Sequence, residues 1–310
     1  MTVSEFVSRP SSSVKPWQRS FLEAHRLPDT YLQSAAKFFD PLAAMVARRR
    51  ETRGGPLRLA LNGSQGSGKS TLGDYLCRAL TEDHALSTVA LSLDDFYLTR
   101  AERRELAERV HPLLQTRGVP GTHDVPLLRE VLDALGRDSS QPVSVPRFDK
   151  SLDDRAAPDA WTLVPAPVDV VVLEGWCLGA TSESPEVLAQ AINALERDED
   201  PDAHWRSYSN QQLRDQYEAL YADLDVWVML AAPGFDQVLR WRTEQEQKLR
   251  ESVFGEGEGL MSDAALMRFV QHFERYTRQC LRDMPQRVDV LFKMDSDRNI
   301  VRTHGLEIGE

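Results

Sequence analysis

The segment Gly63-Ser64-Gln65-Gly66-Ser67-Gly68-Lys69-Ser70 decides the fold, because it fits the pattern Gly-x-x-x-x-Gly-Lys-Ser/Thr in full. The residues before it, Leu57 to Asn62, are typical of a short buried strand. The residues after it, from Thr71 to Leu80, carry apolar side chains at helical spacing. A strand, a glycine-rich loop and a helix are the setting in which this pattern binds phosphate. We therefore predict a nucleotide-phosphate site here, and an ordinary glycine-rich turn is the alternative.

The chemistry of such a loop assigns roles to its residues. Glycines allow successive backbone N–H groups to turn inward around phosphate oxygens, and the N-terminus of the following helix favours an anion. Lys69 can reach the β- and γ-phosphates, and the Ser70 hydroxyl can bind Mg²⁺. The predicted nucleotide contacts are Gly63, Ser64, Gln65, Gly66, Ser67, Gly68, Lys69, Ser70 and Thr71.

Composition narrows the class of protein. A chain of 310 residues with 41% hydrophobic residues is long enough for one large domain with insertions. A formal charge of -11 argues against sequence-independent binding to DNA or RNA, so we expect a small-molecule partner. Three widely separated cysteines (Cys77, Cys177 and Cys280) indicate neither a disulfide framework nor a zinc site. No apolar run reaches membrane-spanning length and no secretory signal is visible, so we expect a cytoplasmic protein.

Two further strands are expected to end in acids. The strand from Ser87 to Leu93 leads into Asp94 and Asp95, and the apolar run from 168 to 173 leads into Glu174. In an open parallel sheet, ligands gather at the carboxyl ends of the strands, so these acids should lie near the phosphate loop. Asp94 could accept the proton of an attacking hydroxyl, although it could instead cap the next helix, and the role of Asp95 stays open.

Glu174 occupies the position of a second carboxylate that orients Mg²⁺, usually through water. With Ser70 it forms the predicted metal pair.

The insertion after Asp95 is the candidate substrate region. A charged helix from about 100 to 109 precedes the loop 111–124, whose two prolines and two glycines exclude a regular element and indicate a fixed shape. This loop carries Arg117, His123 and Asp124, which could hold a small polyhydroxy acid, or it could be a structural connector.

A second irregular segment also carries charges suited to an anion. Arg147, Lys150 and Arg155 lie near Asp149, and fork or point charges of this kind bind anions, whereas surface ion pairing is the simpler interpretation. Farther along, a helix that begins near Pro233-Gly234 carries Arg242, Lys248 and Arg250. These cations could close over a transferring phosphoryl group as a lid, or could form a solvated helix face.

Taken together, these segments resemble a family. The phosphate loop, Asp94-Asp95-Phe96-Tyr97, Pro146-Arg147-Phe148-Asp149-Lys150 and Leu173-Glu174-Gly175-Trp176 are similar to motifs of the phosphoribulokinase/uridine kinase group. Within that group, the loop Arg117-Gly118-Val119-Pro120-Gly121-Thr122-His123-Asp124 resembles the plant/fungal-type D-glycerate 3-kinases and their bacterial relatives. The similarity runs from about Pro56 to the C-terminus. Phe148 departs from it, because relatives often carry tyrosine there, so we assign that ring no hydroxyl chemistry.

The resemblance implies the fold and the reaction. We expect an α/β P-loop NTPase fold of three layers, with a mostly parallel central sheet and helical insertions. An N-terminal helical extension (1–50) should precede a kinase domain (51–310) with a substrate-loop insertion (about 100–160) and a lid-like helical insertion (about 181–221 and 240–283). Helices in the extension should be interrupted before Pro41.

In the implied reaction, ATP with bound Mg²⁺ phosphorylates D-glycerate to give 3-phosphoglycerate and ADP, with Lys69 and Asp94 as catalytic residues. The substrate contacts then include Asp94, Arg117, His123, Asp124, Arg147 and Arg155, with one of the arginines on the glycerate carboxylate. Two alternatives stay open, namely a kinase of the same group that acts on a nucleoside or pantothenate, and a regulatory P-loop NTPase that signals through a protein contact. The loop 117–124 counts against the second.

Overall fold

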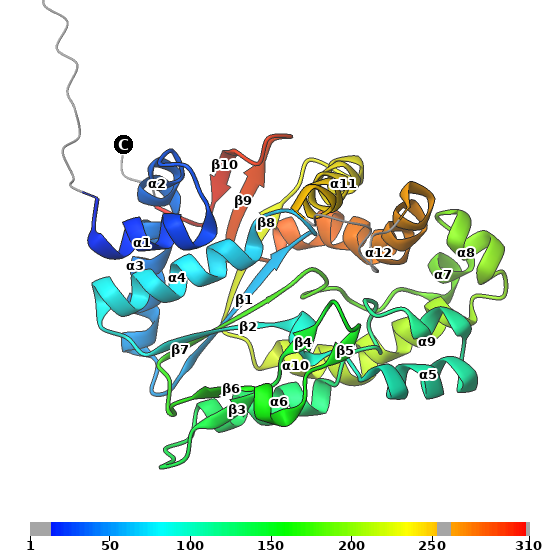
Figure 1. The fold of residues 1–310 in the computed structure, drawn as a ribbon, viewed down its shortest axis with the longest axis horizontal. Coiled ribbons are helices and arrows are strands. Elements are labelled where there is room, and N and C mark those ends of the chain that lie inside the picture. Colours follow the sequence, from blue (N-terminus) through cyan, green and yellow to red (C-terminus); the bar gives the residue numbers. More distant parts are fainter. Residues whose placement is uncertain (1–13, 253–261, 308–310) are drawn as a thin grey trace, which may run out of the picture.

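The computed structural model describes residues 14–252 and 262–307 and is built around one six-stranded sheet (Figure 1). The strands follow the order β10-β9-β8-β1-β7-β2, and all neighbours are parallel except β10 and β9. Their bounds are β1 Leu57–Gly63, β2 Thr88–Ser92, β7 Val170–Gly175, β8 Val226–Ala231, β9 Val290–Met294 and β10 Ile300–His304. This arrangement confirms the predicted α/β fold with a mostly parallel central sheet.

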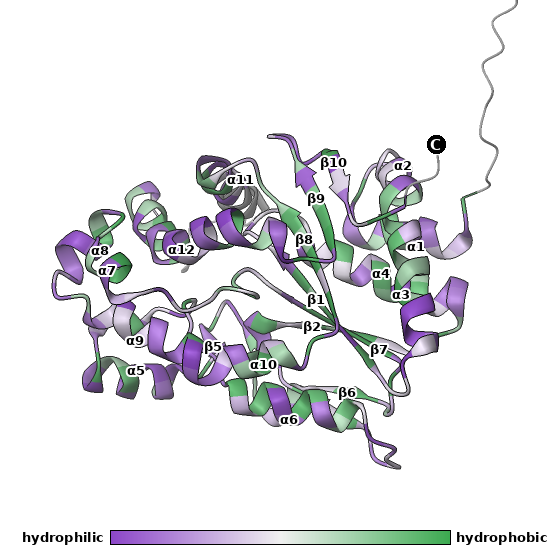
Figure 2. Cartoon of the chain, turned by 180° about the vertical axis from the view of Figure 1, so that it is seen from behind, coloured by the Kyte–Doolittle hydropathy of each residue, from purple (hydrophilic) through white to green (hydrophobic). Residues whose placement is uncertain are grey.

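Successive side chains of the buried strands point to alternate faces of the sheet, so the interior is divided into two cores. Leu59 of β1 belongs to the core on one face of the sheet and Ala60 to the core on the other, because successive side chains of a strand point to opposite faces. Both cores are apolar, which suits a parallel sheet covered on both sides. Figure 2 shows apolar residues concentrated along the central strands and polar residues on the outer surfaces of the helices.

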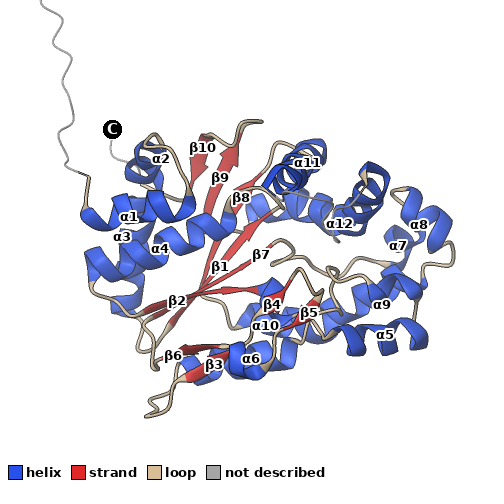
Figure 3. Cartoon of the chain, in the orientation of Figure 1, coloured by secondary structure: helices blue, strands red, loops and turns tan. Residues whose placement is uncertain are grey.

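Helices cover both faces of the sheet (Figure 3), giving the expected three layers. The first core is formed with α1 (Pro16–His25), α3 (Asp40–Thr52), α4 (Lys69–His84) and α11 (Phe235–Ser252). The second is formed with α5 (Arg100–Arg109), α6 (Val125–Leu135), α9 (His204–Gln212) and α10 (Glu218–Ala222). The helix α12 (Asp263–Asp283) contributes to both, and α7 (Pro185–Ala189) and α8 (Ala194–Glu199) lie near its N-terminal half. None of the described helices combines the length and the apolar character needed to cross a bilayer.

The N-terminal helices continue where the sequence predicted an interruption before Pro41. The helix α2 (Tyr31–Ser34) runs through a π-helical turn, Ala35–Phe39, directly into α3. The N–H of Asp40 bonds to the carbonyl of Ala35, and Pro41 stands at the start of α3. The π turn shifts the backbone bonding by one residue directly before Pro41, so the missing amide falls at the junction and the helical run passes the proline without a break.

Aromatic packing fixes this N-terminal segment to the sheet. The ring centroids of Phe38 and Phe39 lie 6.2 Å and 6.0 Å from that of Phe292 on β9. The hydroxyl of Tyr75 on α4 donates to Asp40 at 2.7 Å. Residues 15–52 therefore share a core with the sheet, although the domain boundary near residue 50 remains a prediction.

The insertion between β2 and β7 carries two small antiparallel pairs. In one, β3 (Val143–Val145) pairs with β6 (Thr162–Val164), and in the other, β4 (Phe148–Asp149) pairs with β5 (Asp154–Arg155). These short pairs hold the charged segment of residues 147–155 against the sheet edge that ends in Asp94.

Truncation of Phe292 tests the shared core. Phe292→Ala should lower the free energy of unfolding by about 3–5 kcal/mol, because it removes a fully buried ring that touches both the sheet and the N-terminal helices. Urea denaturation followed by far-UV circular dichroism measures the change. Leu152→Ala, at an exposed position, is the control and should change stability by less than about 0.5 kcal/mol. Equal effects of the two substitutions would contradict the shared core.

Candidate active site

The phosphate loop lies between β1 and α4 in a conformation that depends on glycine. Gly66 and Gly68 have φ angles of 77° and 86°, a region that other residues rarely adopt. A Cβ atom on Gly66 would also come within 2.7 Å of Cβ of Trp241. The hydroxyls of Ser64 and Ser67 are buried without a hydrogen-bond partner among the described residues. Since buried polar groups are ordinarily paired, these hydroxyls indicate that a ligand supplies their partners.

An arginine from the far end of the chain secures this loop. Arg298, in the turn between β9 and β10, donates from Nε to the carbonyl oxygen of Gly66 at 2.8 Å. Its guanidinium lies 4.9 Å from the ring centroid of Trp241 and pairs with Glu244 at 3.0 Å. The Gly66 carbonyl is thereby held from outside the loop.

The predicted metal residues meet directly after the loop. The Ser70 hydroxyl donates to Oε1 of Glu174 at 2.9 Å, and Nζ of Lys69 lies 3.7 Å from Oε2 of the same carboxylate. Glu174 is 5% exposed, and its Oε2 has no hydrogen-bond partner among the described side chains. A buried carboxylate beside a hydroxyl, with an oxygen left over, fits a hydrated divalent cation. The two residues predicted to orient Mg²⁺ thus lie together.

Asp94 lies at the end of β2 between cationic groups. Its Oδ2 accepts from Nζ of Lys150 at 2.9 Å, and its Oδ1 accepts from the Tyr97 hydroxyl at 3.1 Å. Burial alone would raise the pKa of Asp94, but the ammonium groups of Lys150 and Lys69 hold that pKa well below its usual range. Asp94 is therefore an ionised acceptor near the phosphate loop.

Asp95, whose role the sequence left open, anchors the charged segment instead. Its carboxylate accepts from Nη1 of Arg147 at 2.9 Å and from the backbone N–H of Phe148 at 3.1 Å. Arg147 also donates to the Thr162 hydroxyl at 2.8 Å. These bonds place Lys150 at Asp94, so Arg147, a predicted substrate contact, already has two protein partners.

The loop 117–124 has the fixed shape that its glycines indicate. Backbone bonds join Leu98 N–H to the Thr122 carbonyl at 2.9 Å and Asp124 N–H to the Phe96 carbonyl at 2.7 Å. Gly121 has a φ of 95°, and a Cβ atom there would come within 2.7 Å of the Tyr208 ring. This pairing brings His123 beside the segment that follows Asp94.

Asp124 and Arg155, both predicted substrate contacts, pair with each other at 3.1 Å. Asp124 also caps α6 by accepting from the N–H of Leu127, and Arg155 donates twice to the Tyr97 carbonyl. Their polar atoms brace the site, and a contact with substrate stays a prediction for both.

Arg117 reaches the site from the same loop. Its guanidinium pairs with Asp153 and lies 5.3 Å from the ring centroid of Phe148. It also lines a cavity of about 660 Å³ together with Gln115 and Thr116. Arg147 and Arg155, the other two arginines predicted to meet the acceptor carboxylate, do not line this cavity.

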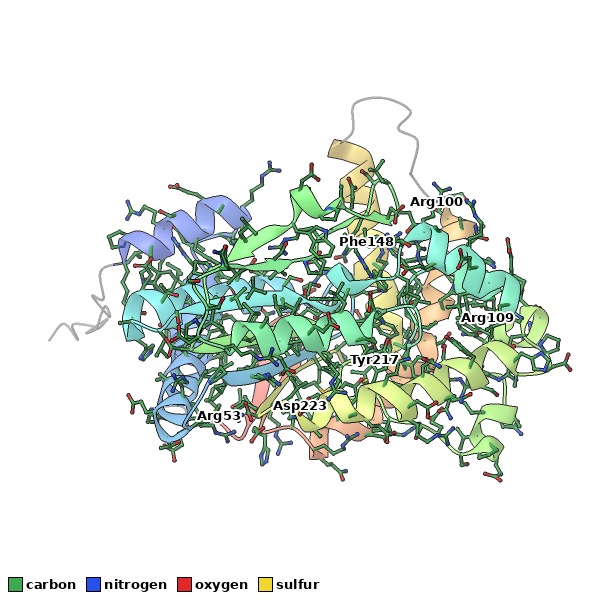
Figure 4. All side chains as sticks on the ribbon, turned by 90° about the horizontal axis from the view of Figure 1, so that it is seen from below. Arg53, Arg100, Arg109, Phe148, Tyr217 and Asp223 are labelled. Atoms are coloured by element: carbon green, nitrogen blue, oxygen red, sulfur yellow. The ribbon has the colours of Figure 1, made fainter. Side chains whose placement is uncertain are left out.

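His123 is held as a neutral donor. Its ring stacks on Tyr97 with centroids 4.4 Å apart, and Nδ1 lies 2.6 Å from the hydroxyl of Tyr217 (labelled in Figure 4), which accepts the N–H of Gly121. In the tautomer in which Nδ1 accepts the Tyr217 proton, the imidazole proton resides on Nε2. Nε2 is buried and has no described partner. Burial lowers the pKa of His123 to about 4, against a smaller opposing effect of Asp94, so the ring is neutral near pH 7.

The predicted lid lies only partly within the described side chains. The guanidinium carbon of Arg242, on α11, is 5.9 Å from the ring centroid of Phe269 on α12. The side chains of Lys248 and Arg250 lie outside the described residues. A lid formed by these three cations remains a prediction.

Three residues of the site were not among the predicted site residues. Lys150 belongs to the charged segment 147–155 that the sequence analysis described. The acid pair Asp94-Asp95 after β2 is the sequence signal that could have pointed to a cation opposite it. Tyr217 and Arg298 act from a helical segment and from a turn that carry no motif. Only their contacts with His123 and Gly66 reveal them.

Comparison with known proteins gives a consistent picture. The chain is 35% identical over 277 residues to the uncharacterized kinase mug58 of Schizosaccharomyces pombe, which covers 87% of this chain and 93% of that protein. It is 31% identical over 229 residues to the chloroplastic D-glycerate 3-kinase of Arabidopsis thaliana, covering 70% of this chain and 46% of that protein. The structure of a D-glycerate 3-kinase from Cryptococcus neoformans superposes with a TM-score of 0.72 at 28% identity, over 86% of this chain and 97% of that one. No family model matches the chain.

Two buried histidines make the free energy of unfolding depend on pH. An unfolded histidine binds a proton near pH 6.5, whereas folded His123 and His272 have their pKa lowered to about 4, so stability should fall as the pH drops from 6.5 towards 4. Each histidine should contribute a slope of up to about 1.4 kcal/mol per pH unit in that window.

Urea denaturation between pH 4.5 and 6.5 measures this slope. His123→Gln should reduce it, and His204→Gln, at an exposed position, controls for the loss of a histidine. An unchanged slope in His123→Gln would contradict the buried neutral imidazole.

Proposed function

This chain belongs to the P-loop kinase family that includes mug58 and D-glycerate 3-kinases, and from that premise we propose that it transfers the γ-phosphoryl group of ATP to a hydroxyl of D-glycerate. The observation that carries the proposal is the ionised carboxylate of Asp94, which lies under the electrostatic influence of Lys69 and is flanked by the 117–124 loop. A phosphate cradle next to a hydroxyl-orienting acid is the arrangement that phosphoryl transfer requires.

The reacting groups have defined tasks in this proposal. Lys69 and the amides of the phosphate loop hold the β- and γ-phosphates and stabilise the charge that develops on the transferring group. The acceptor hydroxyl donates a hydrogen bond to Asp94, and its oxygen forms a bond to the γ-phosphorus. The bond from that phosphorus to the β–γ bridging oxygen breaks, and ADP leaves with the electron pair.

The proton of the acceptor hydroxyl passes to Asp94. Because the pKa of Asp94 is depressed by Lys150 and Lys69, this carboxylate is a weak base, so the proton moves late, when the new oxygen–phosphorus bond has made the hydroxyl more acidic. A loose transition state places little demand on base strength, and orientation of the hydroxyl is then the main contribution of Asp94.

Ser70 and Glu174 fit a Mg²⁺ ion, which would neutralise phosphate charge when bound with ATP. The acceptor end of the site is formed by Arg117 and His123. The Arg117 guanidinium suits the glycerate carboxylate, which it can bind through two parallel N–H donors. The Nε2–H of His123 supplies a neutral donor to an oxygen of the acceptor, so that the site does not place a second acid or base next to Asp94.

An acceptor panel tests the function. ADP release from Mg²⁺-ATP should be stimulated strongly by D-glycerate, and much less by L-glycerate, uridine, pantothenate or ribulose 5-phosphate. A control without acceptor reports hydrolysis by water. Stimulation by another compound would overturn the glycerate assignment but keep the kinase chemistry. Release that ignores every acceptor would contradict the kinase and favour a nucleotide-dependent switch.

Replacement of Asp94 separates orientation of the hydroxyl from nucleotide binding. Asp94→Asn should lower kcat by a factor of about 10²–10⁴, the usual contribution of a positioned acid or base, while the KM for ATP changes far less. Steady-state kinetics with varied ATP at saturating acceptor measures both constants. A variant with near-normal kcat would demote Asp94 to a structural role.

Replacement of Arg117 tests the carboxylate contact. Arg117→Ala should raise the KM for D-glycerate at least tenfold without a matching rise in the KM for ATP, because charge-assisted hydrogen bonds to the acceptor contribute about 1.5–3 kcal/mol. Arg137→Ala, whose side chain is 75% exposed, is the matched control. An unchanged acceptor KM in Arg117→Ala would move the carboxylate site elsewhere.

A further inference from the structure

The turn of residues 150–153, between β4 and β5, places two opposite charges on the two groups that the proposed kinase uses to hold its acceptor. Lys150, at the start of the turn, donates to Oδ2 of Asp94 at 2.9 Å. Asp153, at its end, accepts through Oδ1 from Nη1 of Arg117. Charges of the protein itself therefore pair with both groups, and the contact at Arg117 is the one that an acceptor carboxylate would have to replace.

Asp153 is held by a second arginine as well. Arg103 of α5, whose side chain is 1% exposed, donates to Oδ2 of Asp153 at 3.1 Å and to its backbone carbonyl. It also donates to two backbone carbonyls of neighbouring segments. The guanidinium carbons of Arg103 and Arg117 lie 5.8 Å and 5.3 Å from the ring centroid of Phe148, which Figure 4 labels. One carboxylate thus faces two guanidiniums, of which Arg103 is fixed in the interior and Arg117 reaches a cavity.

The surroundings of Asp153 allow it to release Arg117. Its side chain is 41% exposed, and it lines the same cavity of about 660 Å³ as Arg117. Because one oxygen keeps Arg103 and the other can reach water, the release would not leave a buried, unpaired charge. Exchange of the partner of Arg117 therefore costs little.

A carboxylate that enters this cavity would compete with Asp153 for the same guanidinium. Arg117 then exchanges one charge-assisted hydrogen bond for another, so that the loss of the ion pair is offset. A neutral alcohol offers no such replacement and gains nothing at Arg117 while Asp153 stays in place. Specificity is a difference of affinities, and an internal competitor of this kind favours an anionic acceptor over a neutral one.

We propose that Asp153 is a specificity-determining residue of the acceptor site, which occupies Arg117 until the carboxylate of the acceptor displaces it. The inference rests on the proposed function, because it takes Arg117 as the group that meets that carboxylate. Arg103 anchors Asp153 in both states. The charged segment 147–155 then selects the acceptor as well as bracing the site.

Chemical modification of Arg117 tests its pairing with Asp153. Phenylglyoxal modifies accessible guanidiniums, and peptide mass spectrometry reports the rate at Arg117. Asp153→Asn should raise this rate about threefold or more, because it removes the charge that pairs with the guanidinium. Asparagine suits the φ of 52° at this position, so the variant does not strain the turn. Asp159→Asn, at an exposed position of the same insertion, removes an equal charge and should leave the rate unchanged.

Steady-state kinetics measures the consequence for the acceptor. Asp153→Asn should lower the KM for D-glycerate about two- to fivefold, because the acceptor no longer displaces a carboxylate, while kcat and the KM for ATP stay within about twofold. A KM for D-glycerate that is unchanged or raised would overturn the inference, since Asp153 would then only position Arg117. An unchanged rate of modification at Arg117 would overturn it too.

Protection by D-glycerate separates this inference from the proposed function. D-Glycerate should slow the modification of Arg117 in both proteins, and at a lower concentration in Asp153→Asn. Faster modification of the variant without protection in either protein would discard D-glycerate as the displacing carboxylate and keep the pairing of Asp153 with Arg117. Equal protection at equal concentrations in both proteins would contradict the competition.

Discussion

The parallel pairing of β1 with β7 is the constraint on which the rest of the site depends. In this register Leu61 stands opposite Glu174, so the strand that enters the phosphate loop ends beside the strand that delivers the acid. A slip by one residue would turn Glu174 to the other face of the sheet and leave a buried carboxylate without Ser70 and Lys69. The buried apolar residues of both strands hold this register, and packing energy therefore fixes the position of Glu174 beside Ser70 and Lys69.

Around that centre, several charged residues of the insertion form ion pairs with other protein groups. Asp95 holds Arg147 and Asp124 holds Arg155, and these pairs shape the segments that carry Lys150 and His123. An ion pair of this kind positions neighbouring side chains more than it stabilises the fold. Asp94, Arg117 and the Nε2 of His123 are the groups that we propose meet the substrate, although Arg117 also pairs with Asp153 and Asp94 with Lys150.

Local patterns made the fold and the phosphate-loop end of the site predictable from the sequence. The loop motif, the acids after β2 and the acid at the end of β7 lie within short stretches whose spacing determines their placement. The remainder depends on contacts between distant segments: Arg298 reaches Gly66 across 232 residues, and Tyr217 reaches His123 across 94. The π turn before Pro41 likewise has no signal in the sequence periodicity, which indicated a break there instead.

Identification of the phosphorylated product tests the central claim most directly. The claim is that Asp94 holds a hydroxyl of D-glycerate against the γ-phosphate of ATP. Phosphorus NMR of the reaction mixture should show one phosphomonoester that grows in step with ADP and couples to the protons of carbon 3 of glycerate. Growth of inorganic phosphate alone, with no ester of glycerate, would contradict the account, because it would mean that water and not the acceptor occupies the position opposite the leaving group.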